Sequence, residues 1–173
     1  SAGLAIINGR GLRISKLPGR LSELDALVES DPTSGTIGIG HTRWATHGAP
    51  TEINAHPHTD CHDRIALVHN GIIENAGVLR TRLLERGHTF RSETDTEVLV
   101  HLIEEAFEGD LAEAVRAALR HVEGTYGIAA IALGQPDHIV AARMGSPLLV
   151  GLDNGNLFVA SDAAAVVGHT RKV

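Results

Sequence analysis

Four segments of the sequence gather side chains that can hold a small charged ligand. The first, His41–Gly48, contains Arg43 beside Trp44, the only tryptophan, together with two histidines. A planar guanidinium can hold a carboxylate through two parallel hydrogen bonds, so Arg43 is a candidate anion clamp. Trp44 would then shield the bound ligand from water. The alternative is a solvated or salt-bridged arginine at a strand end, beside a tryptophan of the core.

The second segment, Asn54–His62, is rich in histidine and approaches the H-x-H-x-D-H pattern of binuclear zinc hydrolases. Imidazole and carboxylate groups are suitable zinc ligands. The last histidine, however, is one residue out of place, Pro57 stiffens the segment, and no distant set of ligands is evident. We therefore expect no metal and no cofactor, and histidines that hydrogen-bond the loop or support a neighbouring site. A zinc hydrolase built on this loop is the alternative.

The third segment, Ile65–Asn75, contains the pair Asn70-Gly71 directly after a strand pattern. An Asn-Gly pair in this position normally forms a hairpin turn. The functional alternative uses the side-chain NH₂ of Asn70 and the backbone N–H of Gly71. Two such donors that converge on one point form an oxyanion hole for acyl transfer.

Two further positions have both a structural and a chemical interpretation. Asp95 lies in Ser92–Glu97, where an acidic side chain in the first turn of a helix complements the helix dipole. Turned outward, the same carboxylate would bind a ligand ammonium group. Ser1 would be a nucleophile, with its α-amine as base, if it were a true N-terminus. The alternative is that Ser1 marks an arbitrary boundary, and we favour it.

These segments need elements to position them, and the sequence predicts strands at both ends with helices between. Gly9-Arg10-Gly11 separates two strand patterns as a hairpin. Thr94-Asp95-Thr96-Glu97 is a capping box that starts a helix, and Asp110 with Glu113 repeats that signal. The later strands are expected to form an antiparallel meander. This order predicts an α+β domain with helices packed on antiparallel sheets. The predicted strands are Leu4–Asn8, Leu12–Leu17, Thr36–Trp44, Ile65–Asn70, Gly127–Leu133, His138–Met144, Leu148–Asp153 and Leu157–Ser161, with an early helix at Ser22–Val28.

Composition narrows the class of protein. The 173 residues suit one compact domain, and 43% hydrophobic with 21% charged residues argues against wholesale disorder. A formal net charge of −6 and the lack of a basic patch argue against nucleic acid as a partner. No apolar stretch reaches the roughly 20 residues that cross a bilayer, so no membrane partner is expected. Cys61 is the only cysteine, which fits a reducing compartment and predicts a cytoplasmic location.

Taken in order, four stretches of these segments closely resemble the glutaminase domain of the glutamine–fructose-6-phosphate aminotransferase family: His41–Gly48, Asn54–His58, His69–Asn75 and Ser92–Val98. The resemblance continues through shorter motifs and covers nearly the whole chain. The ordered set is more specific than any one motif, and it favours this family over other class II amidotransferases. The continuing motifs are Gly124-Thr125-Tyr126-Gly127, Ala141-Ala142-Arg143, Gly145-Ser146-Pro147-Leu148, Ala160-Ser161-Asp162 and His169-Thr170-Arg171.

The resemblance implies an N-terminal-nucleophile hydrolase fold, a four-layer αββα sandwich of two antiparallel sheets. In this family an N-terminal cysteine attacks the side-chain amide of L-glutamine. A thioester forms, ammonia leaves, and water then releases L-glutamate. A second, isomerase-type domain uses the ammonia to make glucosamine 6-phosphate from fructose 6-phosphate. The parent protein is expected to be a homo-oligomer.

The resemblance also assigns roles to individual positions. Arg43 corresponds to the clamp on the glutamine α-carboxylate, and Asp95 to the residue that holds the α-ammonium group. Trp44 corresponds to a tryptophan associated with pocket closure and ammonia passage, while His56 and His69 are expected to be structural. The implied substrate-binding residues are Arg43, Trp44, Thr46, His47 and Asp95, and the implied oxyanion hole is Asn70 with Gly71.

The departures from the family pattern concern the ends of the chain. The family begins Cys-Gly-Ile, whereas this sequence starts at a later Ser-Ala-Gly motif. We therefore expect 1–173 to be a partial amidotransferase domain, without the nucleophile segment and the sugar isomerase domains, and inactive alone as a glutaminase. Cys61 lies in a variable loop and is not expected to replace the nucleophile. A class II amidotransferase with another acceptor and a non-catalytic amino-acid-binding module are the alternatives.

Overall fold

A computed structural model describes residues 1–43, 49, 51–153, 155–170 and 172–173. The N-terminal part forms a three-stranded antiparallel sheet in the order β2-β1-β3, in which β3 is an edge strand. The predicted hairpin at Gly9-Arg10-Gly11 is confirmed, because Asn8 pairs directly with Gly11. This sheet comprises β1 (Ala2–Asn8), β2 (Gly11–Leu17) and β3 (Ile37–Thr42), and helix α1 (Leu21–Ser30) lies between β2 and β3 in the chain.

The second sheet has four antiparallel strands in the order β4-β5-β6-β7. Its central strand β5 is buried on both faces, because its side chains alternate between two separate apolar clusters. Ile65 and Leu67 join a cluster with the helices, whereas Ala66 and Val68 join a cluster with the first sheet. The elements are β4 (His58–Thr59), β5 (Ile65–Ile73), β6 (Gly124–Ala132), β7 (Gln135–Met144), α2 (Ala76–Glu85), α3 (Asp95–Ala106) and α4 (Leu111–Leu119).

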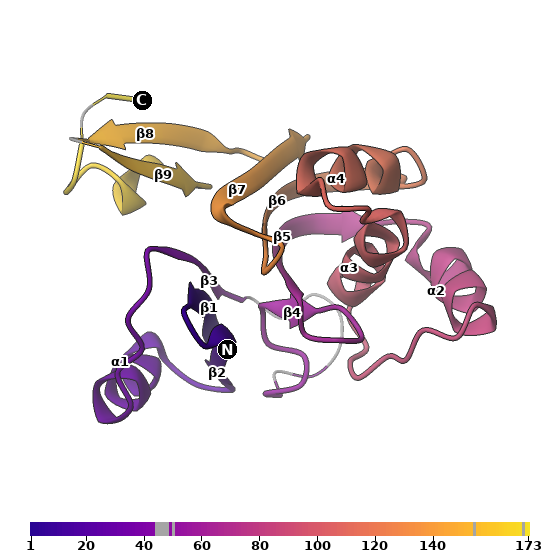
Figure 1. Ribbon diagram of the computed structural model, residues 1–173, viewed down its shortest axis with the longest axis horizontal. Helices are drawn as coiled ribbons and strands as arrows, with labels where there is room; N and C mark the ends of the chain where they lie inside the picture. The colour runs from indigo at the N-terminus through magenta and orange to yellow at the C-terminus, as the bar shows by residue number, and fades with distance from the viewer. Residues whose placement is uncertain (44–48, 50, 154, 171) are drawn as a thin grey trace.

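The layers follow from these clusters. Ala5, Ile7 and Ile39 of the first sheet pack against Ala66 and Val68 of the second. Figure 1 shows α2, α3 and α4 on the far side of the second sheet, and α1 beside the first sheet at the opposite end of the stack. The architecture is therefore the expected α+β sandwich, with two antiparallel sheets between helices.

The C-terminal strands depart from the predicted meander. β6 and β7 pair in the four-stranded sheet, but β8 (Leu149–Asp153) and β9 (Asn156–Ala160) form a separate two-stranded sheet. The chain leaves the larger sheet at Gly145, which has a φ of +75°. This left-handed conformation favours glycine and turns the chain away from β7. The short helix η1 (Ala163–Ala165) follows β9.

The helix starts agree with the sequence signals, with one exception. The Thr94 hydroxyl accepts a hydrogen bond from the Glu97 N–H at 3.3 Å, as an N-cap should. The other hydrogen bond of the predicted capping box, from the Thr94 N–H to the Glu97 side chain, is wrong. Glu97 accepts from the backbone N–H groups of Arg91 and Ser92 instead, at 2.7 and 2.6 Å. Within the described residues, no helix combines the length and apolar character needed to cross a membrane.

Candidate functional site

The predicted binding residues meet around one small cavity where the two sheets and α3 come together. Its volume of about 260 Å³ is below the roughly 300–1,000 Å³ typical of sites for drug-sized ligands. Such a cavity suits a molecule as small as an amino acid. The described residues that line it are His41, Thr42, Arg43, His56, His69, Asn70, Gly71, Thr94, Asp95 and Thr96.

Two opposite charges face this cavity. Arg43 directly follows β3 and is 8% exposed, and burial lowers its pKa while the carboxylate of Asp95 acts in the opposite direction. A guanidinium stays protonated in proteins, so Arg43 carries a positive charge. Asp95 opens α3, and its Oδ2 accepts a hydrogen bond from the Ile73 N–H at 2.9 Å. Among the described residues that line it, the cavity therefore offers one cation and one fixed carboxylate, which complements a zwitterionic amino acid.

The side chain of Asn70 is oriented by His41. Asn70 lies on β5 and His41 on β3, and the distance between His41 Nε2 and Asn70 Oδ1 is 2.8 Å. An amide oxygen only accepts, so Nε2 of His41 carries the proton and donates. Burial lowers the pKa of His41, which keeps the ring neutral near pH 7. With its oxygen held in this way, the Asn70 amide presents its NH₂ as the remaining donor.

Gly71 occupies a position that only glycine fits. Its φ is +132°, and an added Cβ would lie 2.1 Å from the Thr125 carbonyl oxygen. The pair Asn70-Gly71 continues β5 opposite Gly127 and Tyr126. The hairpin-turn interpretation of this pair is therefore wrong, because the strand runs on to Ile73.

A buried hydrogen-bonded chain lies behind the cavity. The Thr96 hydroxyl lies 2.7 Å from His56 Nε2 and 3.1 Å from His69 Nδ1, while His69 Nε2 lies 3.4 Å from the Thr125 carbonyl oxygen. Burial lowers the pKa of both histidines, so both rings are neutral. His69 donates to Thr125, Thr96 donates to His69, and His56 donates to Thr96. These contacts fix the start of α3 against β5.

The histidine loop does not assemble the metal site of a zinc hydrolase. His58 Nε2 lies 3.0 Å from the Thr94 hydroxyl, and burial with the nearby Lys16 charge lowers the His58 pKa to about 3. Asp60 instead accepts hydrogen bonds from the backbone N–H groups of Arg64 and Ile65. Among the described residues, one group of side chains has the spacing of metal ligands, and it contains none of the histidines of this loop. Cys61 is the only residue of the loop that belongs to that group.

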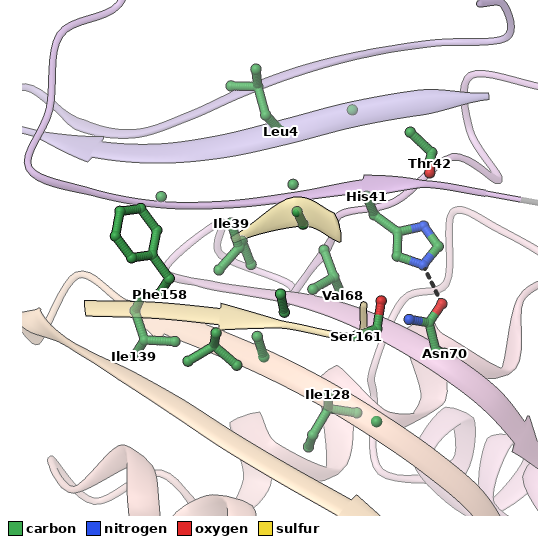
Figure 2. Close-up of a pocket in the computed structure, with 18 of the residues that line it drawn as sticks. Leu4, Ile39, His41, Thr42, Val68, Asn70, Ile128, Ile139, Phe158 and Ser161 are labelled. Carbon is green, nitrogen blue, oxygen red and sulfur yellow. Dashed lines mark hydrogen bonds between the residues drawn. The ribbon is translucent and has the colours of Figure 1, made fainter. Parts of the chain in front are cut away.

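A larger cavity of about 560 Å³ adjoins the small one and shares His41, Thr42, His69 and Asn70 with it. Figure 2 shows the hydrogen bond between His41 and Asn70 at one end of this cavity, with apolar side chains such as Phe158 and Ile139 lining the rest. The cavity runs between the edge strand β3 and the strand β9. Asn70 therefore lies at the junction of a polar pocket and an apolar channel.

The remaining predicted residues either lie outside the described part of the chain or are described away from these cavities. Trp44, Thr46 and His47 lie outside the described residues. Of the described residues that line the two cavities, none is a cysteine and none is Ser1. Ser1 instead continues the ladder between β1 and β3, where its carbonyl oxygen accepts from the Arg43 N–H at 2.8 Å.

Sequence reasoning did not assign His41 and Thr96 to the site. Both lie within segments that the sequence analysis singled out, but their function is to position other side chains. His41 can be recognised only once β3 is known to lie over β5, because 29 residues separate it from Asn70. The one signal in the sequence was that His41 and Arg43 lie two residues apart on a predicted strand, so that their side chains are expected on the same face.

The fold and the cavity together define a class II amidotransferase domain, and comparison of the sequence agrees. Residues 41–168 match the family described as "Glutamine amidotransferase domain". The chain belongs to this family.

The curated relatives make the relationship more specific. The glutamine–fructose-6-phosphate aminotransferase (isomerizing) of Thermus thermophilus is 55% identical over 175 aligned residues, which cover the whole of this chain and 28% of the relative. The protein of the same name from Clostridium perfringens is 49% identical over 173 residues, with the same coverage. The chain thus spans a little over a quarter of the length of these relatives.

Solved structures support the fold. The glutamine phosphoribosylpyrophosphate amidotransferase of B. subtilis superposes with a TM-score of 0.83 at 29% identity, over 98% of this chain and 37% of that one. A class II glutamine aminotransferase domain protein from Silicibacter pomeroyi has a TM-score of 0.57 at 18% identity, over 85% of this chain and 72% of that one. The second similarity concerns the fold alone.

Proposed function

We propose that this chain is the glutamine-hydrolysing half of a glutamine–fructose-6-phosphate aminotransferase. The observation that supports it best is the set of groups around the small cavity. Arg43 and Asp95 supply opposite charges, and the oriented amide of Asn70 lies within the same cavity. The guanidinium binds the α-carboxylate of L-glutamine, and the carboxylate binds its α-ammonium group. The side-chain amide of glutamine then lies at Asn70.

The chemistry follows from this placement. A thiolate attacks the amide carbon of glutamine, and the amide oxygen takes up negative charge. The Asn70 NH₂ and the Gly71 N–H donate hydrogen bonds to that oxygen and stabilise the tetrahedral intermediate. As the C–N bond breaks, the nitrogen takes up the proton that the thiol lost when it became a thiolate and leaves as ammonia, so that a thioester forms. Water hydrolyses the thioester to L-glutamate and restores the thiol.

We place the nucleophile in a segment outside residues 1–173. Cys61 is hydrogen-bonded in a loop with His88 and His101 and is not among the residues lining the cavities. The channel is lined in part by β3, which is an edge strand within the described residues, and it leads to Asn70. An additional strand that enters this channel would bring a thiol to the oxyanion-binding groups. On this proposal residues 1–173 alone do not release glutamate from glutamine.

The use of the ammonia is proposed from the relatives. Two of them are named glutamine–fructose-6-phosphate aminotransferase (isomerizing), and this chain covers 28% of their length. The remaining length would carry the fructose 6-phosphate site. Assembly of the whole protein into a homo-oligomer and a cytoplasmic location stay predictions.

The test measures glutamate release by the protein expressed at the full length of its natural gene. Asn70→Ala should lower kcat by about 10²–10³-fold, the usual cost of losing one oxyanion-hole donor. Asp95→Asn keeps an acceptor for the Ile73 N–H but loses the charge, so KM for glutamine should rise by about 10–100-fold, as expected for a lost charged hydrogen bond.

The exposed carboxylate of Asp137 provides the matched control, since Asp137→Asn should leave both constants unchanged. An Asn70→Ala variant with the kcat of the parent protein would contradict the proposed oxyanion hole. Glutamate release by residues 1–173 alone, lost on Asn70→Ala, would contradict the placement of the nucleophile outside this chain.

A further inference from the structure

Four side chains that the glutamine chemistry does not use converge at one point away from the cavity. Cys61 lies in the loop after β4, His88 in the loop between α2 and α3, and His101 and Glu104 on α3. Each offers one ligand atom, and the four atoms lie within 4.8 Å of one another. Three segments that are distant in sequence therefore direct a thiol, two imidazoles and a carboxylate to the same point.

The distances between these atoms are those of a coordination shell. Cys61 Sγ lies 3.6 Å from Nδ1 of His88 and 3.6 Å from Nδ1 of His101. Glu104 Oε2 lies 3.0 Å from the first of these nitrogens and 2.9 Å from the second. Bonds of about 2.3 Å from zinc to sulfur and about 2.0–2.1 Å from zinc to nitrogen place tetrahedral ligands about 3.6 Å and about 3.3 Å apart. The sulfur–nitrogen distances match directly, and the carboxylate needs to move by only a few tenths of an ångström.

We propose that Cys61, His88, His101 and Glu104 bind one Zn²⁺ ion in a structural, four-coordinate site. A soft thiolate combined with two imidazoles and a carboxylate selects zinc over the hard cations magnesium and calcium. The thiolate and the carboxylate balance the two positive charges of the ion, so the site is neutral overall. Four protein ligands leave no open position for water, and the site has no catalytic task of its own.

The groups around the ligands support this assignment. Ligating histidines normally direct their second nitrogen at a carboxylate or carbonyl group, which fixes the tautomer. Here Nδ1 of both rings faces the cluster, and Nε2 of both rings faces a glutamate. His101 Nε2 lies 3.8 Å from Glu97 Oε1, and His88 Nε2 lies 3.5 Å from Glu105 Oε1. Each histidine therefore has a carboxylate on the side away from the cluster, at ion-pair rather than hydrogen-bond distance.

The position of the cluster gives the ion a structural task. His101 is 1% exposed and packs edge-on against the Phe90 ring, with the centroids 4.6 Å apart. Glu97, which faces His101, also accepts hydrogen bonds from the N–H groups of Arg91 and Ser92. A zinc ion at Cys61 would thus fasten the loops on both sides of α3, including the segment that leads to Asp95.

The test uses the protein at the full length of its natural gene, freed of metal by a chelator and then titrated with Zn²⁺ or Co²⁺. We expect one tightly bound zinc per chain by elemental analysis. We also expect a thiolate-to-cobalt charge-transfer band in the Co²⁺ form. Because loss of a group behind the ligands already costs about 10–100-fold in metal affinity, Cys61→Ser and His88→Ala should each weaken zinc binding by about 100-fold or more. Cys61→Ser should also abolish the charge-transfer band.

His62→Ala is the matched control, because this exposed histidine follows Cys61 directly and lies 4.0 Å from Glu104 Oε1. It should keep one zinc and the band. Circular dichroism in chelator shows whether each variant folds like the parent, so that a lost site is not confused with a lost fold. No stoichiometric zinc in the folded parent protein, or an unchanged affinity and band in Cys61→Ser, would overturn the proposal and leave a hydrogen-bonded histidine–glutamate cluster. Neither result would affect the proposed glutamine chemistry.

Discussion

His41 shows how one hydrogen bond can decide which end of an amide faces a substrate. The imidazole lies 2.8 Å from Asn70 Oδ1, and burial keeps the ring neutral, so a single N–H donates to the amide oxygen. Rotation of the amide by half a turn would direct its NH₂ at His41 and its oxygen at the oxyanion. With the proton on Nε2, His41 stabilises the orientation of Asn70 that the structure shows, in which the NH₂ is left to face the substrate.

We predict that His41→Leu lowers kcat for glutamine hydrolysis by about 10–100-fold, less than the loss of the Asn70 donor itself. His41→Gln places an N–H near the position of Nε2 and should restore most of kcat. KM for glutamine should stay near the parent value in both variants, because His41 does not hold the charged ends of the substrate. Steady-state kinetics of the full-length protein separate these effects. Equal losses of kcat in the Leu and Gln variants would show that His41 only fills space.

At the residue scale, much of the site follows from the sequence. Arg43, Asn70, Gly71 and Asp95 were chosen for their chemistry and for their place in a family pattern, and all four line one cavity. The positioning residues could not be found in this way. Thr96 has the appearance of an ordinary helix residue until the packing of α3 against β5 brings it within 3.1 Å of His69.

At the scale of elements, β5 is the strand that carries the proposed oxyanion hole, and Gly71 determines its course. The φ of +132° at Gly71 is strained for any residue with a side chain, and a Cβ would lie 2.1 Å from the Thr125 carbonyl oxygen. The backbone of β6 would have to move to accommodate a methyl group. Such a movement would also displace the Gly71 N–H.

We predict that Gly71→Ala lowers the free energy of unfolding by about 2–3 kcal/mol and abolishes glutaminase activity. Gly77→Ala in α2 is the matched control, because an added Cβ there meets no atom within 4 Å. Its stability should be unchanged or raised by up to about 1 kcal/mol, as expected for alanine in a helix. Chemical denaturation and glutamate release measure both effects. A Gly71→Ala variant as stable and active as Gly77→Ala would contradict this account of β5.

Local sequence patterns predicted most of the helices and strands. They did not predict how the chain continues at the end of β5 and after β7. Turn chemistry alone indicated a hairpin at Asn70-Gly71, whereas the family resemblance indicated an oxyanion hole; the pair lies within β5 because nine residues of β6 pair with this strand. The meander was expected to continue past β7, and Gly145 directs the chain into a separate hairpin. Both outcomes depend on pairing between segments that are distant in sequence, which propensity and turn chemistry do not encode.

At the scale of the whole molecule, the sandwich places neutral histidines between its layers. The rings of His41 and His56 are tilted against each other with their centroids 4.4 Å apart, and the ring centroid of His58 lies 5.0 Å from that of His56. Burial lowers the pKa of each ring, and the charges of neighbouring groups such as Arg43 and Lys16 lower it further. The sequence showed a cluster of histidines, but only the packing of two sheets and α3 explains why they are structural. The same packing makes the fold sensitive to acid.

The sign of this sensitivity follows from His58, whose pKa falls from its ordinary value of 6.5 to about 3 in the folded protein. The folded state keeps the ring neutral while the unfolded chain takes up a proton, so stability is complete above pH 6.5 and is lost as the pH falls from there towards 3. Each such histidine contributes a slope of up to about 1.4 kcal/mol per pH unit. We predict that His58→Gln, whose amide can still hydrogen-bond the Thr94 hydroxyl, reduces the slope of unfolding free energy between pH 6 and pH 4 by up to that amount. His121→Gln, at an exposed position, should leave the slope unchanged. Urea unfolding of the full-length protein at a series of pH values measures both slopes, and equal slopes in the two variants would show that His58 does not carry this acid sensitivity.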